Sequence, residues 1–161
     1  MERIEDGNAD AQIDAVLRAA NVLLRVVARS VVEVEDVVTS PQLRVLVLIA
    51  LHGPQNPGAV ATELGVHPSN ATRICDRLVS AGLVVRREDP VDRRYVALSL
   101  TPAGASLVNT VLEHRRSAVA AVMARMPEQL RGAAALGMAA FAAADGGEGI
   151  EDGRFTVHLQ R

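Results

Sequence analysis

Two glycines divide residues 59–82 into a pair of short helices, and no other feature limits the fold as strongly. Residues 59–64 favour a helix that stops at Gly65, and Pro68 opens a second helix that stops at Gly82. Glycine suits the left-handed backbone conformation at a helix end. The apolar positions are, in chain order, Val60, Ala61, Leu64, Val66, Ala71, Ile74 and Leu78. This order and spacing predict a helix-turn-helix.

A β-hairpin is expected directly after the second helix. Residues 83–87 are strand-like, a turn follows at 88–92, and Val96, Leu98 and Leu100 alternate along a second strand. Arg93 and Arg94 lie near its tip, and a thin, arginine-tipped hairpin suits the negative potential of a DNA minor groove. The expected fold is therefore mainly α (α+β), a winged helix-turn-helix with a two-stranded β-wing.

Long apolar helices flank this unit. Apolar residues recur at helical spacing from about Asp10 to Val37, and a break follows in which Ser40 is the expected N-cap. Residues 42–51 are nearly all apolar and predict a buried helix, and Thr101 and Pro102 open another helix. The expected organisation is a disordered N-terminal tail at 1–9, an N-terminal dimerisation helix at 10–38, a winged helix-turn-helix at 39–101, C-terminal dimerisation helices at 102–145 and a flexible tail at 146–161.

Charge is distributed unevenly along the chain of 161 residues, whose formal net charge is −2. Residues 1–38 carry four arginines against eight acidic residues, whereas residues 67–94 carry six arginines against four. The arginine-rich middle is consistent with an ordinary solvated surface or with a nucleic-acid contact, because binding depends on where the charge lies.

The outward face of the second helix favours the nucleic-acid contact. If its apolar residues point inward, the outward or flanking residues are Ser69, Asn70, Thr72, Arg73, Asp76 and Arg77. Asparagine and arginine can form bidentate hydrogen bonds with adenine and guanine edges in a major groove. Serine and threonine hydroxyls commonly reach phosphates. Asp76 is expected to pair within the protein, since phosphates repel a carboxylate.

Four motifs in sequence order resemble the MarR family (multiple-antibiotic-resistance regulators). They are Ser69-Asn70-Ala71-Thr72-Arg73-Ile74-Cys75-Asp76-Arg77-Leu78, Gly82-Leu83-Val84, Asp89-Pro90-x-Asp92-Arg93-Arg94 and Leu98-x-Leu100-Thr101-Pro102-x-Gly104. The resemblance covers roughly residues 10–145. It implies a homodimeric transcription factor that binds pseudo-palindromic operators in double-stranded DNA, usually as a repressor. Many such proteins are released from DNA by a small aromatic or phenolic effector.

The resemblance also assigns roles to individual residues. Ser69, Asn70, Thr72 and Arg73 match positions that contact bases and phosphates, and Arg77 would support the backbone contacts. Asp92 and Arg94 match a wing pair in which the acid braces an arginine that enters the minor groove, and Arg93 lies beside them. The terminal helices match the dimer interface. No residues of an effector site can be assigned from the resemblance.

Other classes of function find little support in the sequence. Cys75 is the single cysteine, which excludes a disulfide scaffold and favours a reducing, cytoplasmic location and a buried, structural thiol. The four histidines lack metal spacing, and no P-loop, GxGxxG or nucleophile elbow occurs, so we expect no enzyme, metal or cofactor. The acidic N-terminus and short apolar runs predict neither a signal peptide nor a membrane span. A winged-helix module for protein interaction remains the main alternative.

Overall fold

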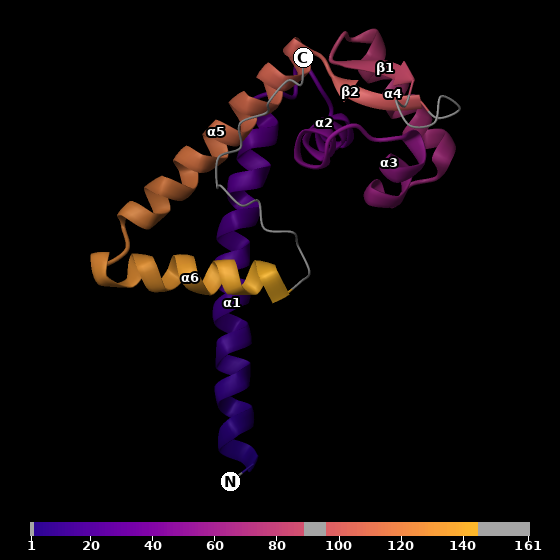
Figure 1. The fold of residues 1–161 in the computed structure, drawn as a ribbon. Coiled ribbons are helices and arrows are strands. Elements are labelled where there is room, and N and C mark those ends of the chain that lie inside the picture. Colours follow the sequence, from indigo (N-terminus) through magenta and orange to yellow (C-terminus); the bar gives the residue numbers. More distant parts are fainter. Residues whose placement is uncertain (1, 89–95, 145–161) are drawn as a thin grey trace.

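The computed structural model describes residues 2–88 and 96–144, which form helices and one small sheet (Figure 1). The helix-turn-helix and the sheet lie at one end of the molecule, and the long helices extend away from them. The elements are α1 (Glu2–Val32), α2 (Ser40–His52), α3 (Pro57–Leu64), α4 (Pro68–Ser80), β1 (Val84–Glu88), β2 (Val96–Leu100), α5 (Pro102–Ala124) and α6 (Glu128–Ala144). The mainly α winged helix-turn-helix expected from the sequence is confirmed.

The hydrophobic core lies where α2, α3, α4, the sheet and the first half of α5 meet. Its largest fully buried side chains include Leu43 and Leu46 of α2, Leu78 of α4, Leu98 of β2 and Val108 of α5. The apolar run in α2 is thus buried as expected, because α2 packs against α3, α4, α5 and β2. Burial of these side chains supplies the main favourable term in folding.

The two strands pair antiparallel, with a register that runs from Val84 opposite Leu100 to Glu88 opposite Val96. Gln55 adds a one-residue bridge on the other side of β2: its N–H donates to the carbonyl of Leu98 (3.1 Å), and the N–H of Leu98 donates to the carbonyl of Gln55 (2.7 Å). The sequence did not predict this bridge, because Gln55 lies within a turn-like segment. The hairpin tip, with Asp92, Arg93 and Arg94, lies outside the described residues.

The N-cap of α2 differs from the expected one. The cap is Thr39, not Ser40, and its backbone N–H donates to Oε1 of Gln42 at 2.7 Å. This bond from the cap backbone to a side chain three residues on is one half of a capping box. Pro41 then lies in the first turn, where its missing N–H costs nothing. The helix α3 also begins two residues before the expected position, since Asn56 caps it by accepting from the N–H of Ala59 (2.8 Å).

The first helix corrects the expected boundaries at both ends. The expected disordered tail at 1–9 is wrong for residues 2–9, which are the first turns of α1. The helix stops at Val32 and not near Val37, and a turn follows over 33–37. Val34 of this turn and Val38 directly after it are buried in the core, and the valine-rich sequence there has low helix propensity.

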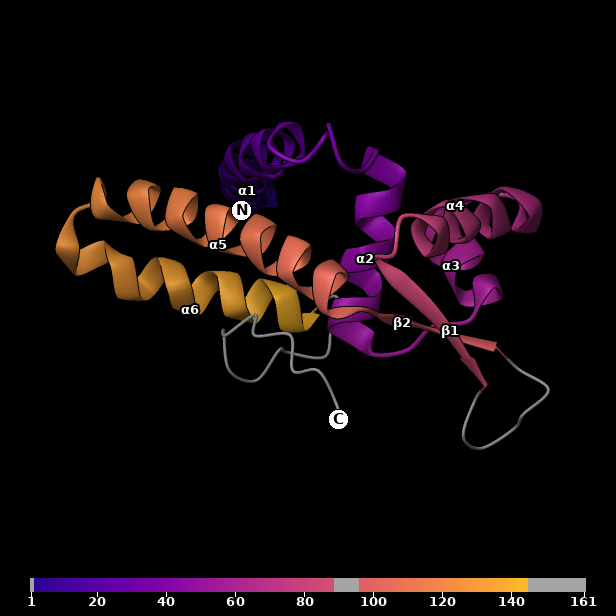
Figure 2. The same ribbon diagram turned by 90° about the horizontal axis from the view of Figure 1, so that it is seen from above.

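The long helices leave much of their surface uncovered within the chain. The first half of α1 projects beyond every other described element, and α6 turns back from the end of α5 (Figures 1 and 2). Contacts of α1 are chiefly with α5, and α6 has no buried residue. No helix in the described part of the chain combines the length and apolar character needed to cross a bilayer. The expected flexible tail at 146–161 lies outside the described residues.

Candidate nucleic-acid interface

The turn between α3 and α4 has the geometry that the two glycines predicted. Gly65 adopts a left-handed conformation (φ +64°), and its N–H donates to the carbonyl of Thr62 at 3.1 Å. The N–H of Val66 donates to the carbonyl of Ala61 at 3.0 Å, which closes the helix end. Ala61 is buried, and its small side chain allows α3 and α4 to cross closely. The helix-turn-helix is confirmed.

The helix α4 has one buried and one exposed face. Ala71, Cys75 and Leu78 are fully buried, and Ile74 is half-buried. The residues expected to face outward are all exposed and lie along the opposite side: Ser69, Asn70, Thr72, Arg73, Asp76 and Arg77. The structure therefore brings together the five α4 residues expected to contact DNA.

The first turn of α4 is capped by a residue that the sequence analysis missed. Nδ1 of His67 accepts from the backbone N–H of Ser69 (3.3 Å) and lies 2.8 Å from the Ser69 hydroxyl oxygen. The hydroxyl of Thr72 donates to the carbonyl of Pro68 at 3.0 Å. The hydroxyls of Ser69 and Thr72 thus already have local partners. To donate to a phosphate, the Thr72 hydroxyl must rotate its proton away from the carbonyl of Pro68. Histidine is an uncommon cap, so only the position before Pro68 could have indicated this role.

The one acidic residue on the exposed face of α4 is paired with an arginine of the sheet. The guanidinium of Arg86 in β1 donates to Oδ1 of Asp76, as expected for a carboxylate that pairs within the protein. Among the described residues, no hydrogen bond or ion pair engages the side chain of Asn70, Arg73 or Arg77. The exposed face therefore presents two arginines and an amide whose donors are available to a partner.

Cys75 lies on the buried face beneath these residues. Burial raises the pKa of the Cys75 thiol; the nearby Arg86 has a smaller, opposite effect on that pKa, and Asp76 adds to the rise. A raised pKa keeps the thiol protonated and unreactive near neutral pH. These properties agree with the structural role expected for Cys75.

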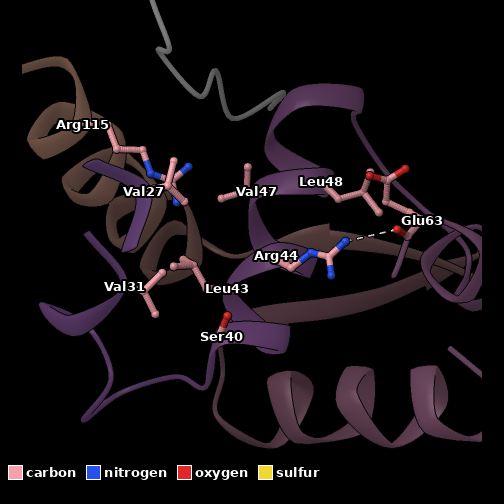
Figure 3. A pocket seen from close by; sticks show the side chains of 9 residues that line it. All are labelled: Val27, Val31, Ser40, Leu43, Arg44, Val47, Leu48, Glu63 and Arg115. Carbon is pink, nitrogen blue, oxygen red and sulfur yellow. Dashed lines mark hydrogen bonds between the residues drawn. The ribbon is translucent and has the colours of Figure 1, made fainter. Parts of the chain in front are cut away.

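A cavity of about 310 Å³ lies beside the helix-turn-helix, between α1, α2, α3 and α5 (Figure 3). Val27, Val31, Leu43, Val47 and Leu48 form its apolar lining, and Ser40, Arg44, Glu63 and Arg115 its polar lining. Nε of Arg115 donates to the Ser30 hydroxyl (2.8 Å), and burial lowers the pKa of Arg115. Nη2 of Arg44 donates to the carbonyl of Glu63 (3.3 Å).

Local sequence patterns do not predict this cavity, because its lining comes from residues far apart in the chain. Val27 of α1 and Arg115 of α5, for example, both line it. Elsewhere within residues 2–88 and 96–144, no three histidine, cysteine, aspartate or glutamate side chains group together as metal ligands would.

Known proteins resemble this chain in both sequence and structure. A family model described as the MarR family matches residues 38–96. The HTH-type transcriptional repressor MdtR of Bacillus subtilis is 34% identical over 92 residues, which are 57% of this chain and 59% of MdtR. The uncharacterized HTH-type transcriptional regulator ML2140 of Mycobacterium leprae is 37% identical over 79 residues, which are 49% of this chain and 55% of ML2140. The chain thus matches little more than half the length of these two relatives.

A solved structure extends the likeness to nearly the whole of a relative. The crystal structure of RV1404 from Mycobacterium tuberculosis is 38% identical, covers 86% of this chain and 94% of its own, and superposes with a TM-score of 0.73. Of the two sequence relatives, ML2140 is named a transcriptional regulator and MdtR a transcriptional repressor. The exposed face of α4, the wing strands and these likenesses together show that the chain belongs to the MarR family of winged helix-turn-helix transcriptional regulators.

Proposed function

We propose that the protein is a homodimer that binds operator DNA sequence-specifically, with α4 in the major groove. The observation that carries this proposal is the exposed face of α4, on which Asn70, Arg73 and Arg77 have no partner within the described residues while Asp76 is neutralised by Arg86. Asn70 and Arg73 are suited to bidentate hydrogen bonds with adenine and guanine edges. Arg77, Ser69 and Thr72 are suited to phosphates, which fix the register of a protein on the duplex.

The wing is proposed to contact the adjacent minor groove. This part of the proposal rests on the sequence, because Asp92, Arg93 and Arg94 lie outside the described residues. Its support is the position of β1, which carries one arm of the hairpin and is joined to α4 through the ion pair between Arg86 and Asp76. A hairpin anchored beside a major-groove helix can reach the neighbouring groove, where an inserted arginine is favoured by the negative potential.

The dimer is proposed to form through the terminal helices. In α1 the side chains of Ile13, Leu17 and Leu24 are exposed, and in α6 those of Leu136 and Phe141 are exposed. Leu136 is 73% exposed and Leu24 is 64% exposed, whereas the leucines of the core, such as Leu46 and Leu78, are fully buried. Exposed apolar surface of this extent favours a partner chain, and a two-fold dimer would present two copies of α4 to a pseudo-palindromic site.

A repressor role and a cytoplasmic location complete the proposal. MdtR is named a repressor. A dimer that covers an operator next to a promoter would exclude other proteins from that DNA. Such a protein would act in the cytoplasm, where a lone thiol such as Cys75 stays reduced.

The test is binding of the full chain to the duplex upstream of its own gene, against a scrambled duplex of equal length, at two salt concentrations. Fluorescence anisotropy is expected to show tight, sequence-selective binding that weakens steeply with salt, because phosphate contacts release counterions. Weak binding that is equal on this duplex and on duplexes selected from a random pool would contradict the proposal. Dimerisation is measured separately by sedimentation.

We further propose that a small aromatic or phenolic effector regulates DNA binding from the cavity between α1, α2, α3 and α5. Arg115 supports this, because its half-buried guanidinium has only the Ser30 hydroxyl as a described partner and lines the cavity together with Val27, Val31 and other apolar side chains. An aromatic carboxylate or phenolate would complement such a site. Benzoate is the probe: titration into the protein–duplex complex should release the DNA, and Arg115→Met should require far more benzoate. Identical release curves for both proteins would overturn the assignment.

A further inference from the structure

The end of the recognition helix α4 is fastened directly to the start of α5. After α4, Gly82 adopts a left-handed conformation (φ +69°), and the N–H of Leu83 returns to the carbonyl of Leu78 (3.0 Å). The carbonyls of Gly82 and Leu83 both accept hydrogen bonds from Thr101. Its hydroxyl donates to the carbonyl of Gly82 (2.7 Å), and its backbone N–H donates to the carbonyl of Leu83 (3.0 Å).

Thr101 is at the same time the N-cap of α5. Its Oγ1 accepts from the N–H of Gly104 at 3.1 Å. A single hydroxyl therefore donates to the segment that ends α4 and accepts from the first turn of α5. This four-residue contact, made by Gly82, Leu83, Thr101 and Gly104, is called the α4–α5 joint below.

Gly104 makes the joint too close for any other residue. A β-carbon at this position would lie 2.1 Å from the carbonyl oxygen of Leu83 and 3.0 Å from its carbonyl carbon. Ordinary contact begins at 3.4 Å, so a side chain here would force the two backbones apart by about 1 Å. The obstructing atoms belong to the backbone and cannot rotate away. Gly104 is also buried, which leaves α5 no room to slide past Leu83.

The joint links two helices that share α2 as a neighbour but otherwise pack on different elements. The helix α4 also packs on α3 and β1, whereas α5 also packs on α1 and β2. The joint is thus the direct end-to-end connection between the helix proposed to enter the major groove and a helix proposed to support the dimer. Its hydrogen bonds and its steric limit both restrict the angle between the two.

We propose that Thr101 and Gly104 are positioning residues that fix the angle of α4 to α5 and thereby set the separation of the two recognition helices. This inference rests on the proposed function, because the separation exists only in a DNA-binding dimer. Two-fold symmetry doubles any displacement at one joint. Half-sites in duplex DNA recur once per helical turn, so the dimer accepts one spacing and rejects others.

The experiment compares spacing preference between the wild-type chain and Gly104→Ala. Wild-type protein first selects paired half-sites from a random duplex pool, and duplexes are then made with the half-sites moved together or apart by single base pairs. Gly104→Ala should bind the wild-type spacing about tenfold or more weakly, which corresponds to the loss of one base contact, and its best spacing should change. Its affinity for a duplex with one half-site should stay within about twofold of wild type, because the exposed face of α4 is untouched.

Gly132→Ala is the matched control, since a β-carbon at Gly132 meets no atom within 4 Å. It should keep the wild-type spacing. A folded, dimeric Gly104→Ala protein with wild-type spacing preference and affinity would overturn this inference and leave the proposed function standing. If the wild-type chain selects no paired half-sites, the proposed function fails, and the inference fails with it.

A second pair of variants keeps the test decisive if Gly104→Ala does not fold. Thr101→Val removes the hydroxyl that joins Gly82 to Gly104 while preserving the shape of the side chain, and Thr101→Ser restores the hydroxyl. Thr101→Val should change the spacing preference and Thr101→Ser should not. Equal spacing preferences in these two proteins would overturn the inference, because a purely structural role of the residue predicts no change in spacing for either.

Discussion

The guanidinium of Arg86 donates to the carboxylate of Asp76 and so joins strand β1 to the exposed face of α4. Both side chains are about half exposed, so the pair contributes only about 0–1 kcal/mol to stability. Its larger effect is electrostatic. It neutralises the one acidic group on a face otherwise occupied by Asn70, Arg73 and Arg77.

Loss of Arg86 should therefore weaken DNA binding more than it weakens the fold. Arg86→Ala leaves Asp76 uncompensated and facing the duplex, so we expect reduced affinity in anisotropy titrations and a free energy of unfolding within about 1 kcal/mol of wild type. The double variant Asp76→Asn, Arg86→Ala should recover part of the affinity. If it binds no better than Arg86→Ala, repulsion by Asp76 is not the cause.

Cys75 should be unreactive in the folded protein. Burial raises the pKa of its thiol, so a disulfide reagent should react slowly with native protein even at mildly alkaline pH and fully after denaturation. Because the unfolded chain ionises its thiol first, the free energy of unfolding should fall as pH rises from the ordinary thiol pKa through the raised one. Rapid, stoichiometric reaction of native protein would show that Cys75 is accessible.

The apolar side of α2 should dominate the stability of the helix-turn-helix. Leu46 is fully buried, so Leu46→Ala should lower the free energy of unfolding by about 2–5 kcal/mol, as measured by urea denaturation at fixed protein concentration. Leu51→Ala makes the same change on the same helix at a side chain that is 40% exposed, and it should cost clearly less. Equal losses would place Leu51 in an interface of the assembled protein.

Charged substitutions on the uncovered helices should dissociate the proposed dimer. Leu17→Glu in α1 and Leu136→Glu in α6 place a carboxylate on exposed apolar surface, and sedimentation should show a shift to monomer at concentrations where wild type is dimeric. Ala11→Glu is the control, because Ala11 lies at helical spacing from Asp14 and Arg18 on the polar side of α1. A wild-type monomer, or Glu variants that remain dimeric, would count against an interface built from α1 and α6.

Local sequence signals predicted most of the fold. Gly65 and Gly82 take positive φ as expected, and Thr101 caps α5 as expected. These features depend on a residue and its immediate neighbours. The sequence predicts Ser40 as the cap of α2, whereas the structure shows Thr39. Either residue is a good N-cap, and only the bond to Gln42 distinguishes them.

Features that depend on distant residues could not be predicted. The contact of Gly104 with Leu83, the bridge of Gln55 to Leu98 and the cavity beside Arg115 all join segments that no local pattern connects. The candidate DNA-binding residues of α4 were predictable because they follow from the helical period alone.

The central claim is that the exposed face of α4 recognises DNA sequence, and Arg73→Ala tests it most directly. Affinity is measured for the selected operator duplex and for a scrambled duplex, with Arg18→Ala as a control that removes the same charge from α1. We predict that Arg73→Ala loses about 1–3 kcal/mol of discrimination between the two duplexes. Arg18→Ala should keep the wild-type ratio of affinities. An unchanged ratio for folded, dimeric Arg73→Ala protein would contradict the account.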